Sequence, residues 1–284
     1  MKPLLFTGSE PGGQLMITTD VENYPGYPDG IMGPQMMDEF RKQAERFGTE
    51  IRYEMIEEVN FEGEIKKLKT ESGEELEAHS VIISTGASAK WLGLPSEQKL
   101  MSKGVSACAV CDGFFFKGQD VIVVGGGDTA AEEATYLAKL CPKVHLLVRR
   151  DELRASKIMQ ERVKKQENII IHWDTSTEEI LGEEEVTGAR VVNNKTGETE
   201  IINATGFFVA IGHKPNTSIF KDILDMDDLG YLITKPDSTK TNVEGVFASG
   251  DAQDRIYRQA VTAAGTGCMA ALEAERLLAE KGII

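Results

Sequence analysis

The sequence predicts an α/β fold built on a parallel β-sheet. Its 284 residues are enough for about two domains. Glycine is abundant, with 28 residues, and only 7% of the residues are aromatic, which suits tight turns between strands and helices. Short apolar runs alternate with segments of helical periodicity. This alternation is typical of βαβ units, and such units imply a parallel sheet.

One βαβ unit can be followed along the sequence. An apolar strand over 120–124 runs into three glycines, and a helix is expected over 128–140 because small and apolar residues recur there at helical spacing. Pro142 ends that helix, and the next strand covers 143–148.

Other segments extend this pattern. Residues 81–87 are predicted as a buried strand that ends in a glycine turn, and 207–212 and 246–251 are further strand-to-turn segments. The last helix is expected from 260 to 281. Its predicted apolar face carries Ala264, Met269, Leu272 and Leu277.

Composition excludes some classes of function. A net charge of −15 argues against a nucleic-acid partner, because phosphate binding needs a basic face. No run of about 18 apolar residues exists, so no membrane span or membrane partner is expected. The apolar part of the N-terminal segment is too short for a secretory signal. We therefore expect a cytoplasmic protein.

A dinucleotide fingerprint, G-x-G-x-x-G/A, follows the strand over 120–124. Gly125 allows the tight turn, Gly127 lets the backbone approach a pyrophosphate, and Ala130 lets helix and strand pack closely. Asp128 and Thr129 open the helix, whose N-terminal N–H groups favour phosphate. The strand before and the helix and second strand after supply the context that a lone fingerprint lacks.

The residues after the second strand determine which nicotinamide cofactor binds. An acidic residue there would bind the ribose hydroxyls of NAD, but this sequence has Arg149 and Arg150, with Arg154 one turn on. Guanidinium groups suit a 2′-phosphate, so the sequence favours NADPH over NADH. The alternative is a basic surface patch without a ligand.

The Cys-x-x-Cys pair Cys108 and Cys111 indicates thiol–disulfide chemistry. Asp112 follows directly and could move protons as the disulfide opens and closes. The alternatives are a zinc half-site or a purely structural disulfide. Zinc is disfavoured because no second ligand pair is present, so no metal is predicted. Cys141 is expected to be buried at a helix end, and Cys268 in the core of the last helix.

Six motifs spread over essentially the whole chain resemble the bacterial-type, low-molecular-weight thioredoxin reductases. They are Gly-Gly-Gln-Leu at 12–15, Val-Glu-Asn-Tyr-Pro-Gly at 21–26, Cys-Ala-Val-Cys-Asp-Gly at 108–113, Gly-Gly-Gly-Asp-Thr-Ala at 125–130, Arg-Arg-Asp-Glu-Leu-Arg-Ala at 149–155 and Tyr-Arg-Gln-Ala at 257–260.

The resemblance implies two Rossmann-like domains of three-layer ββα type, one inserted in the other. Residues 1–88 and 215–284 would form a discontinuous FAD-binding domain, and 89–214 an NADPH-binding domain with the redox cysteines. By resemblance, Asp251 lies near the flavin ribityl chain. The alternative interpretation of the glycines among the implied FAD contacts is that they only form turns. The implied FAD contacts are Thr7, Gly8, Ser9, Glu10, Gly12, Gly13, Gln14, Asn23, Thr85, Gly86, Ala87, Asp251, Arg258, Gln259 and Ala260.

The implied mechanism is a relay from NADPH to FAD, then to the Cys108–Cys111 disulfide, and finally to the disulfide of a small thioredoxin-like protein. Asp112 would act as acid and base. The family rotates its NADPH domain between two orientations, and hinges are expected near Ala89 and near 214–216. A homodimer is also implied.

The sequence departs from the family at its start. The family opens with a strand, a Gly-x-Gly-x-x-Gly turn and a helix, whereas this sequence opens on a segment that resembles the family's second strand. About thirty residues, the size of a βαβ opening, are expected to be missing. Two alternatives follow: an inactive, flavin-free NADPH-binding fragment, or a flavin dithiol enzyme with another partner.

Overall fold

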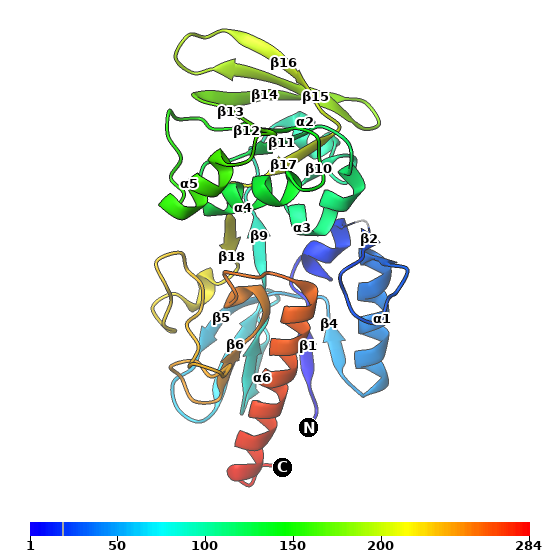
Figure 1. Ribbon diagram of the computed structural model, residues 1–284. Helices are drawn as coiled ribbons and strands as arrows, with labels where there is room; N and C mark the ends of the chain where they lie inside the picture. Colours follow the sequence, from blue (N-terminus) through cyan, green and yellow to red (C-terminus); the bar gives the residue numbers. More distant parts are fainter. Residues whose placement is uncertain (19) are drawn as a thin grey trace. The chain divides into compact units, whose positions relative to one another are not determined.

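The computed structural model describes residues 1–18 and 20–284, and it divides into two compact units (Figure 1). Unit 1 comprises Met1–Ser88 and Lys214–Ile284, and unit 2 comprises Ala89–His213. The chain passes between the units in strands β9 (Ala87–Ala89) and β18 (His213–Pro215), which pair with each other. Which unit binds which nucleotide stays a prediction.

Unit 2 is built on a five-stranded sheet in which every pair of neighbours is parallel, as the sequence predicts. The strands are rich in Val, Ile, Leu and Phe because both faces of the sheet are covered. Their order is β10 (Val105–Ser106), β17 (Gly206–Val209), β11 (Val121–Val124), β12 (Val144–Leu147) and β13 (Ile169–His172).

Alternate residues of β11 serve two different cores. Val121 and Val123 pack with the helices α4 (Asp128–Leu137) and α5 (Lys157–Lys164). Ile122 and Val124 pack with an antiparallel sheet on the other side (Figure 1). That sheet contains β14 (Thr175–Gly182), β15 (Val186–Asn193) and β16 (Thr199–Asn203). The three layers confirm the predicted ββα arrangement.

Unit 1 contains two parallel strand pairs and an antiparallel sheet. A buried cluster that includes Phe61, Ile83, Phe220 and Val246 forms its largest core. The parallel pairs are β1 (Leu4–Phe6) with β4 (Glu50–Arg52), and β8 (Val81–Ile83) with β19 (Val246–Ala248). The antiparallel sheet is β5 (Ile56–Asn60), β6 (Lys66–Thr70) and β7 (Glu75–Ala78), and a separate short pair is β2 (Asp20–Val21) with β3 (Ile31–Met32).

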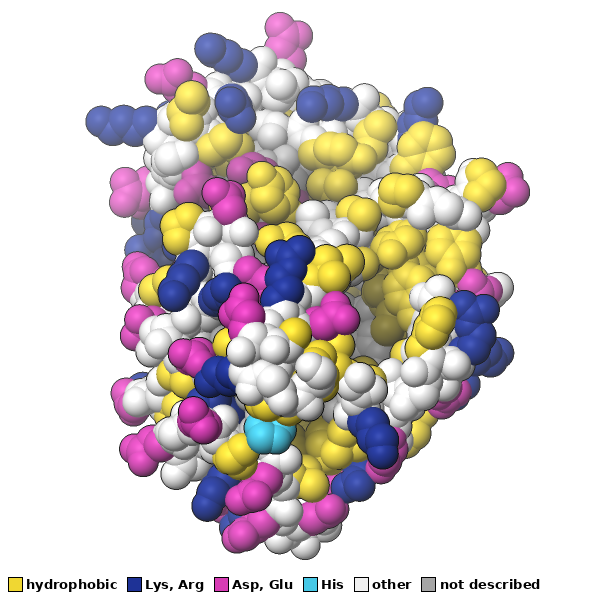
Figure 2. Space-filling view, turned by 90° about the horizontal axis from the view of Figure 1, so that it is seen from below, with side chains coloured by type: hydrophobic (Ala, Val, Ile, Leu, Met, Phe, Trp, Pro, Cys, Tyr) yellow, Lys and Arg dark blue, Asp and Glu magenta, His cyan; other side chains and the backbone are white. Residues whose placement is uncertain are grey.

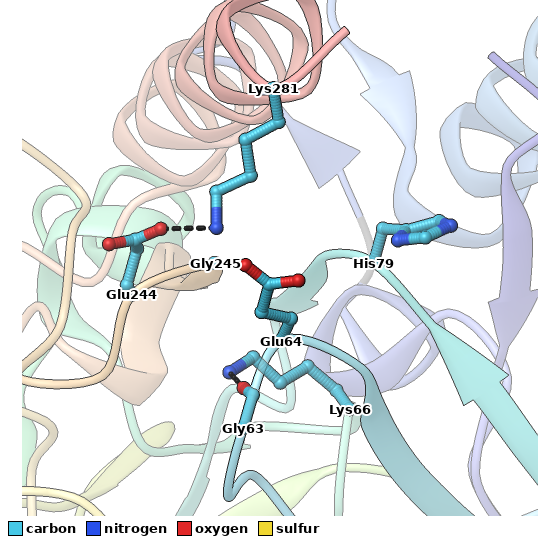
Figure 3. A pocket seen from close by; sticks show the side chains of 7 residues that line it. All are labelled: Gly63, Glu64, Lys66, His79, Glu244, Gly245 and Lys281. Atoms are coloured by element: carbon cyan, nitrogen blue, oxygen red, sulfur yellow. Dashed lines mark hydrogen bonds and ion pairs between the residues drawn. The ribbon is translucent and has the colours of Figure 1, made fainter. Parts of the chain in front are cut away.

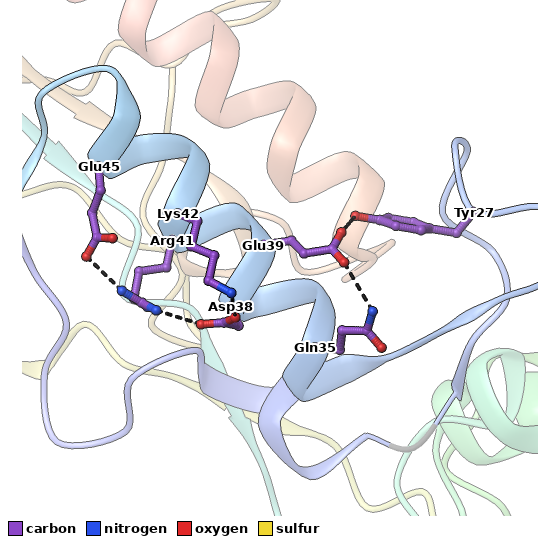
Figure 4. Close-up of polar contacts among 7 residues, drawn as sticks. All are labelled: Tyr27, Gln35, Asp38, Glu39, Arg41, Lys42 and Glu45. Carbon is purple, nitrogen blue, oxygen red and sulfur yellow. Dashed lines mark hydrogen bonds and ion pairs between the residues drawn. The ribbon is translucent and has the colours of Figure 1, made fainter.

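Helix α1 (Gly33–Arg46) has a charged outer face (Figure 4). Arg41 bridges Asp38 at 2.6 Å and Glu45 at 2.8 Å, spacings of three and four residues that face each other on a helix. In the middle of α1, Glu39 accepts the hydroxyl of Tyr27 at 2.8 Å, and this contact ties the loop before β3 to the helix.

Helix α6 (Ala260–Glu280) matches its predicted range within one residue, but only Leu277 of its predicted apolar face packs against the buried residues of the helix. Ala270 and Ala274 form the buried stripe and pack on Phe247 of β19. Met269 and Leu272 are 38% and 44% exposed. Alanines four residues apart let the helix approach the strand closely, and a neighbouring residue in sequence points about 100° away from that stripe.

Cys268 is also exposed, so the prediction that it lies in the core is wrong. It stands two residues before Ala270 and therefore on the opposite side of α6. Cys141 is buried as predicted, four residues beyond Leu137, the last residue of α4.

The predicted strand over 81–87 is shorter than expected. Strand β8 ends at Ile83, and Ile82 is 40% exposed rather than buried. The chain then turns at Gly86, with φ +69°, before β9 begins. Asn216 holds this turn, because its backbone N–H donates to the Gly86 carbonyl at 2.9 Å and its side chain donates to the Thr85 carbonyl at 3.0 Å.

Among the described residues, no helix has the length and apolar character needed to cross a bilayer. On the face drawn in Figure 2, cationic and anionic side chains are interspersed. Short helical segments carry several site residues: Gly13–Ile17, α3 (Ala109–Asp112), Gly113–Phe116 and Gly250–Ala252. A further short helix is α2 (Pro95–Lys99).

Candidate functional site

Cys108 and Cys111 form a disulfide in unit 2, with their Cα atoms 5.3 Å apart. Cys108 follows β10 and caps α3, and its Sγ accepts the N–H of Cys111 at 3.3 Å. The Asp112 N–H closes the same turn on the Cys108 carbonyl at 3.1 Å. One helical turn thus brings the two sulfurs together, as a spacing of three residues allows.

Exposed apolar side chains lie close to the disulfide in sequence. Val110, between the cysteines, is 50% exposed, and Phe114 directly after the turn is 55% exposed. Phe116 points inward instead and packs edge-on against Phe208, with ring centroids 5.3 Å apart. The redox turn is therefore anchored on one side by the core of unit 2 and bordered by apolar side chains that remain open to solvent.

Asp112 is half-buried, and its two oxygens differ. Oδ2 accepts the hydroxyl of Ser106 at 2.5 Å, whereas Oδ1 is buried and has no hydrogen-bond partner in the part of the chain that the structure describes. Burial raises the pKa of Asp112, and the hydrogen bond from Ser106 opposes that rise. A carboxyl group with a raised pKa can both take and return a proton, as the predicted acid–base role requires.

Ser106 was not among the residues that the sequence singled out. A serine at the end of a short apolar strand carries no signal of its own, because its partner lies six residues further along in a separate turn. Its contact with Asp112 is visible only in the folded chain.

No group of three or more His, Cys, Asp or Glu side chains within 1–18 and 20–284 could hold a metal ion.

The glycine turn after β11 meets the demands that the fingerprint implies. A Cβ on Gly125, whose φ is +149°, would lie 2.4 Å from the Ala210 carbonyl oxygen and 2.8 Å from the Cβ of Ala130. A Cβ on Gly127 would meet nothing within 4 Å. The first position thus needs glycine for packing, and the open space at Gly127, the N-cap of α4, fits the approach of a phosphate group.

The arginines lie beside this turn. The backbone N–H of Arg154 donates to the Gly126 carbonyl at 2.6 Å, so the loop over 149–155 is tied to the glycines. The side chains of Arg149, Arg150 and Arg154 are exposed, and no ion pair engages them among the described residues. Their placement fits a 2′-phosphate, although the assignment of these residues to NADPH stays a prediction.

The residues predicted to contact FAD all lie in unit 1, and three of their segments follow parallel strands. Residues 7–14 follow β1, 85–87 follow β8, and Asp251 follows β19. Ser84 and Ser249, at the ends of β8 and β19, share a hydrogen bond of 2.6 Å, which brings the last two segments together. Ligands of open α/β sheets bind at such carboxyl ends of strands.

The structure joins only some of these segments directly. The Asn23 amide donates to Gln259 at 2.9 Å, a contact between residues 236 positions apart. Gln259 also caps α6, which begins at Ala260. No hydrogen bond among the described residues links 7–14 with 85–87 or with Asp251. These placements fit a flavin that spans several segments, and the individual contacts stay predictions.

Asp254, which the sequence analysis missed, organises the loop before α6. Its carboxylate accepts the N–H groups of Ile256 and Tyr257, each at 2.9 Å, and that of Arg258 at 3.1 Å. Arg258 adopts the left-handed region, with φ +48°, which is uncommon for a residue with a side chain. An aspartate that accepts the N–H two residues further on, as Asp254 does from Ile256, is a known turn former and could have been noticed.

Asp251 lies next to this loop and is largely buried. Burial raises its pKa to about 6, the negative charge of Asp254 adds to the rise, and Arg258 opposes it. The carboxyl of Asp251 therefore changes between its neutral and charged forms near pH 6.

A separate polar pocket of about 220 Å³ lies elsewhere in unit 1 (Figure 3). Lys66 is almost fully buried there, and its ammonium donates to the carbonyls of Phe61 at 3.1 Å and Gly63 at 2.7 Å. Lys281 pairs with Glu244 across the pocket. None of the residues that line this pocket was predicted as a site residue. We attribute the charged side chains of this pocket to stabilisation of the turn between β5 and β6.

Comparison with known proteins places these features in a family. Residues 2–267 match the family described as "Pyridine nucleotide-disulphide oxidoreductase". The chain is 56% identical over 281 residues to "Thioredoxin reductase" of Rickettsia bellii, covering 98% of this chain and 91% of that protein. It is 52% identical to "Thioredoxin reductase" of Streptomyces clavuligerus, covering 98% and 87%. The solved structure "Thioredoxin reductase from Giardia duodenalis" superposes with a TM-score of 0.94 at 43% identity, covering 98% and 91%.

Proposed function

This chain belongs to the pyridine nucleotide-disulphide oxidoreductases, and within them to the thioredoxin reductases, and we propose on that premise that it reduces the disulfide of thioredoxin. NADPH and FAD would supply the electrons, and the Cys108–Cys111 pair would pass them to thioredoxin. Membership of the family implies both cofactors. The observation that carries the proposal is the disulfide itself, formed beside a half-buried Asp112 in the unit that holds the dinucleotide fingerprint.

We assign the pyrophosphate of NADPH to the start of α4, where the glycine turn leaves room at Gly127. The fingerprint residues are Gly125, Gly127, Asp128, Thr129 and Ala130, and the 2′-phosphate partners are Arg149, Arg150 and Arg154. FAD is assigned to unit 1, against 7–14, Asn23, 85–87, Asp251 and 258–260. FAD, when bound, supplies the two-electron carrier between the nicotinamide and the disulfide.

The cysteines carry out the final exchange. The S–S bond of the partner breaks, the Cys108–Cys111 bond forms again, and two electrons and two protons leave the enzyme's dithiol for the partner's thiols. Asp112 takes a proton from an enzyme thiol on its free oxygen and returns it to the partner's leaving thiolate. The raised pKa of Asp112 keeps both directions accessible.

The direct test is to purify this chain, record its visible spectrum and assay NADPH oxidation that depends on oxidised thioredoxin. We expect flavin absorption bands and thioredoxin-dependent turnover. A folded but colourless protein would instead favour the flavin-free NADPH-binding fragment. A flavin-containing protein that NADPH reduces but that does not act on thioredoxin would favour a dithiol enzyme with another partner.

Asp254→Ala is expected to weaken flavin binding about tenfold, because three backbone N–H groups lose their shared acceptor and the 255–258 loop loses its conformation. The measurement is the flavin dissociation constant by fluorescence titration of the apoprotein. Glu275→Ala, on an exposed position of α6, is the control and should bind flavin as the parent does. Equal affinity in the two variants would remove Asp254 from the flavin site.

We also propose that the enzyme works in the cytoplasm as a homodimer. The support is the resemblance to the family together with a redox-type Cys-x-x-Cys, a pattern typical of reducing compartments. Analytical ultracentrifugation of the purified chain tests the dimer.

A further inference from the structure

Ser106 lies between the redox disulfide and the acid–base carboxyl. Its Oγ donates to Asp112 Oδ2 at 2.5 Å and accepts the backbone N–H of Cys108 at 3.0 Å. The hydroxyl thus donates to the aspartate, with a longer contact of 3.4 Å to the Cys108 carbonyl, and accepts the N–H of the cysteine. Ser106 is 8% exposed, so water competes little for these contacts.

The position of this hydroxyl is set by the sheet. Ser106 is the last residue of β10, where it stands opposite Phe208 of β17 in parallel register. Phe208 is fully buried and belongs to the core under α4. The backbone that carries the hydroxyl is therefore held by the sheet, whereas Cys108 and Asp112 lie in the short turn beyond it.

The hydrogen bond from Ser106 gives the two carboxylate oxygens of Asp112 different roles. With Oδ2 occupied by Ser106, the buried Oδ1 is the oxygen left to exchange a proton. Helix α4, which packs against α3, carries the titratable groups Asp128, Glu132, Glu133 and Tyr136. The pKa of Asp112 responds to burial and then to Ser106, and none of these α4 groups contributes to its shift.

We propose that Ser106 is a positioning residue of the dithiol centre: its hydroxyl orients Asp112 through Oδ2, leaves Oδ1 for proton transfer, and ties that carboxyl to the main chain of Cys108. The inference rests on the acid–base role of Asp112 proposed above. The proton balance is simple: a cysteine thiol loses its proton to Oδ1, and the same proton later joins the partner's thiolate.

A first measurement follows the ionisation of Asp112 without any cofactor or partner. In the oxidised protein labelled with 13C at the aspartate carboxyls, the Asp112 resonance is assigned by its loss in Asp112→Asn, and its chemical shift is followed against pH. In Ser106→Ala the titration of Asp112 is expected to move to higher pH, because the hydrogen bond that favours the carboxylate is gone.

Further variants distinguish the loss of the Ser106 hydroxyl from an effect on folding. Ser106→Thr keeps the hydroxyl, so Asp112 should titrate in it as in the parent. Ser106→Val has the shape of the threonine variant without the hydroxyl, so Asp112 should titrate in it as in Ser106→Ala. This pair decides the question if Ser106→Ala does not fold. Ser96→Ala is the matched control, since it removes a half-buried serine hydroxyl that accepts the Ile180 N–H in the same unit. An Asp112 titration unchanged in both Ser106→Ala and Ser106→Val would overturn the proposal.

A second measurement follows the exchange step. The chemically reduced protein is mixed with oxidised thioredoxin, and the rate is expected to fall about tenfold in Ser106→Ala and Ser106→Val, as for the loss of one hydrogen bond to a charged group, and to recover in Ser106→Thr. A rate that is the same with and without the hydroxyl would contradict the positioning role. If the parent itself does not exchange with thioredoxin, the proposed function fails, while the titration of Asp112 still decides the role of Ser106.

Discussion

Cys108→Ser is expected to reduce thioredoxin turnover to the background of the assay, while NADPH still bleaches the flavin. A serine hydroxyl cannot form or exchange the Cys108–Cys111 bond, so the last transfer of electrons has no carrier. The earlier transfer from nicotinamide to flavin does not involve the sulfurs. The measurements are a coupled assay with oxidised thioredoxin and anaerobic titration of the flavin absorbance with NADPH.

Cys268→Ser provides the matched control, because Cys268 is an exposed free thiol on α6, outside the disulfide. It should keep the turnover of the parent. Retained thioredoxin turnover in Cys108→Ser would remove the Cys108–Cys111 pair from the mechanism. Loss of flavin bleaching along with turnover would point instead to a damaged fold, which circular dichroism would reveal.

The double change Arg149→Ala and Arg150→Ala is expected to lower the preference for NADPH over NADH by about a hundredfold. Each charge-assisted hydrogen bond to a phosphate contributes about 1.5–3 kcal/mol, and NADH has no 2′-phosphate to lose. The ratio of kcat/KM for the two nucleotides is the quantity to measure. It should fall because the value for NADPH drops while that for NADH stays nearly constant.

Arg162→Ala tests whether the change in nucleotide preference depends on where the arginines lie or only on the loss of positive charge. Arg162 lies in the last turn of α5, away from the loop that follows β12, and its removal lowers the charge of the same unit. The nucleotide preference should not change. An unchanged preference in the double variant as well would show that the arginines are a surface patch, the alternative that their sequence position leaves open.

Local patterns were sufficient to predict much of unit 2. The strand, glycine turn, helix and second strand around Gly125 follow from periodicity, although the helix ends at Leu137, three residues before the predicted end at 140. The Cys-x-x-Cys spacing likewise predicts a disulfide, since one turn is enough to close it.

Prediction was weakest where a single element had to be oriented against the rest. The range of α6 was correct, yet its buried stripe runs through Ala270 and Ala274 rather than Met269 and Leu272. Hydrophobicity predicts that the larger side chains of α6 are buried. The close approach of the helix to Phe247 instead requires small side chains at the buried positions. The segment over 81–87 does form a strand followed by a glycine turn, but the strand ends at Ile83, and Asn216, far along the chain, holds the turn at Gly86.

The sequence by itself determined the chemistry of this protein: a cysteine pair, an adjacent carboxyl, a dinucleotide turn and the arginines beside it, all coded in short contiguous motifs. Only the tertiary structure decided how those groups are held. Ser106 reaches Asp112 from a separate strand, and Asn23 meets Gln259 across 236 positions of chain. Such contacts depend on the path of the whole backbone, and no local pattern of residues encodes that path.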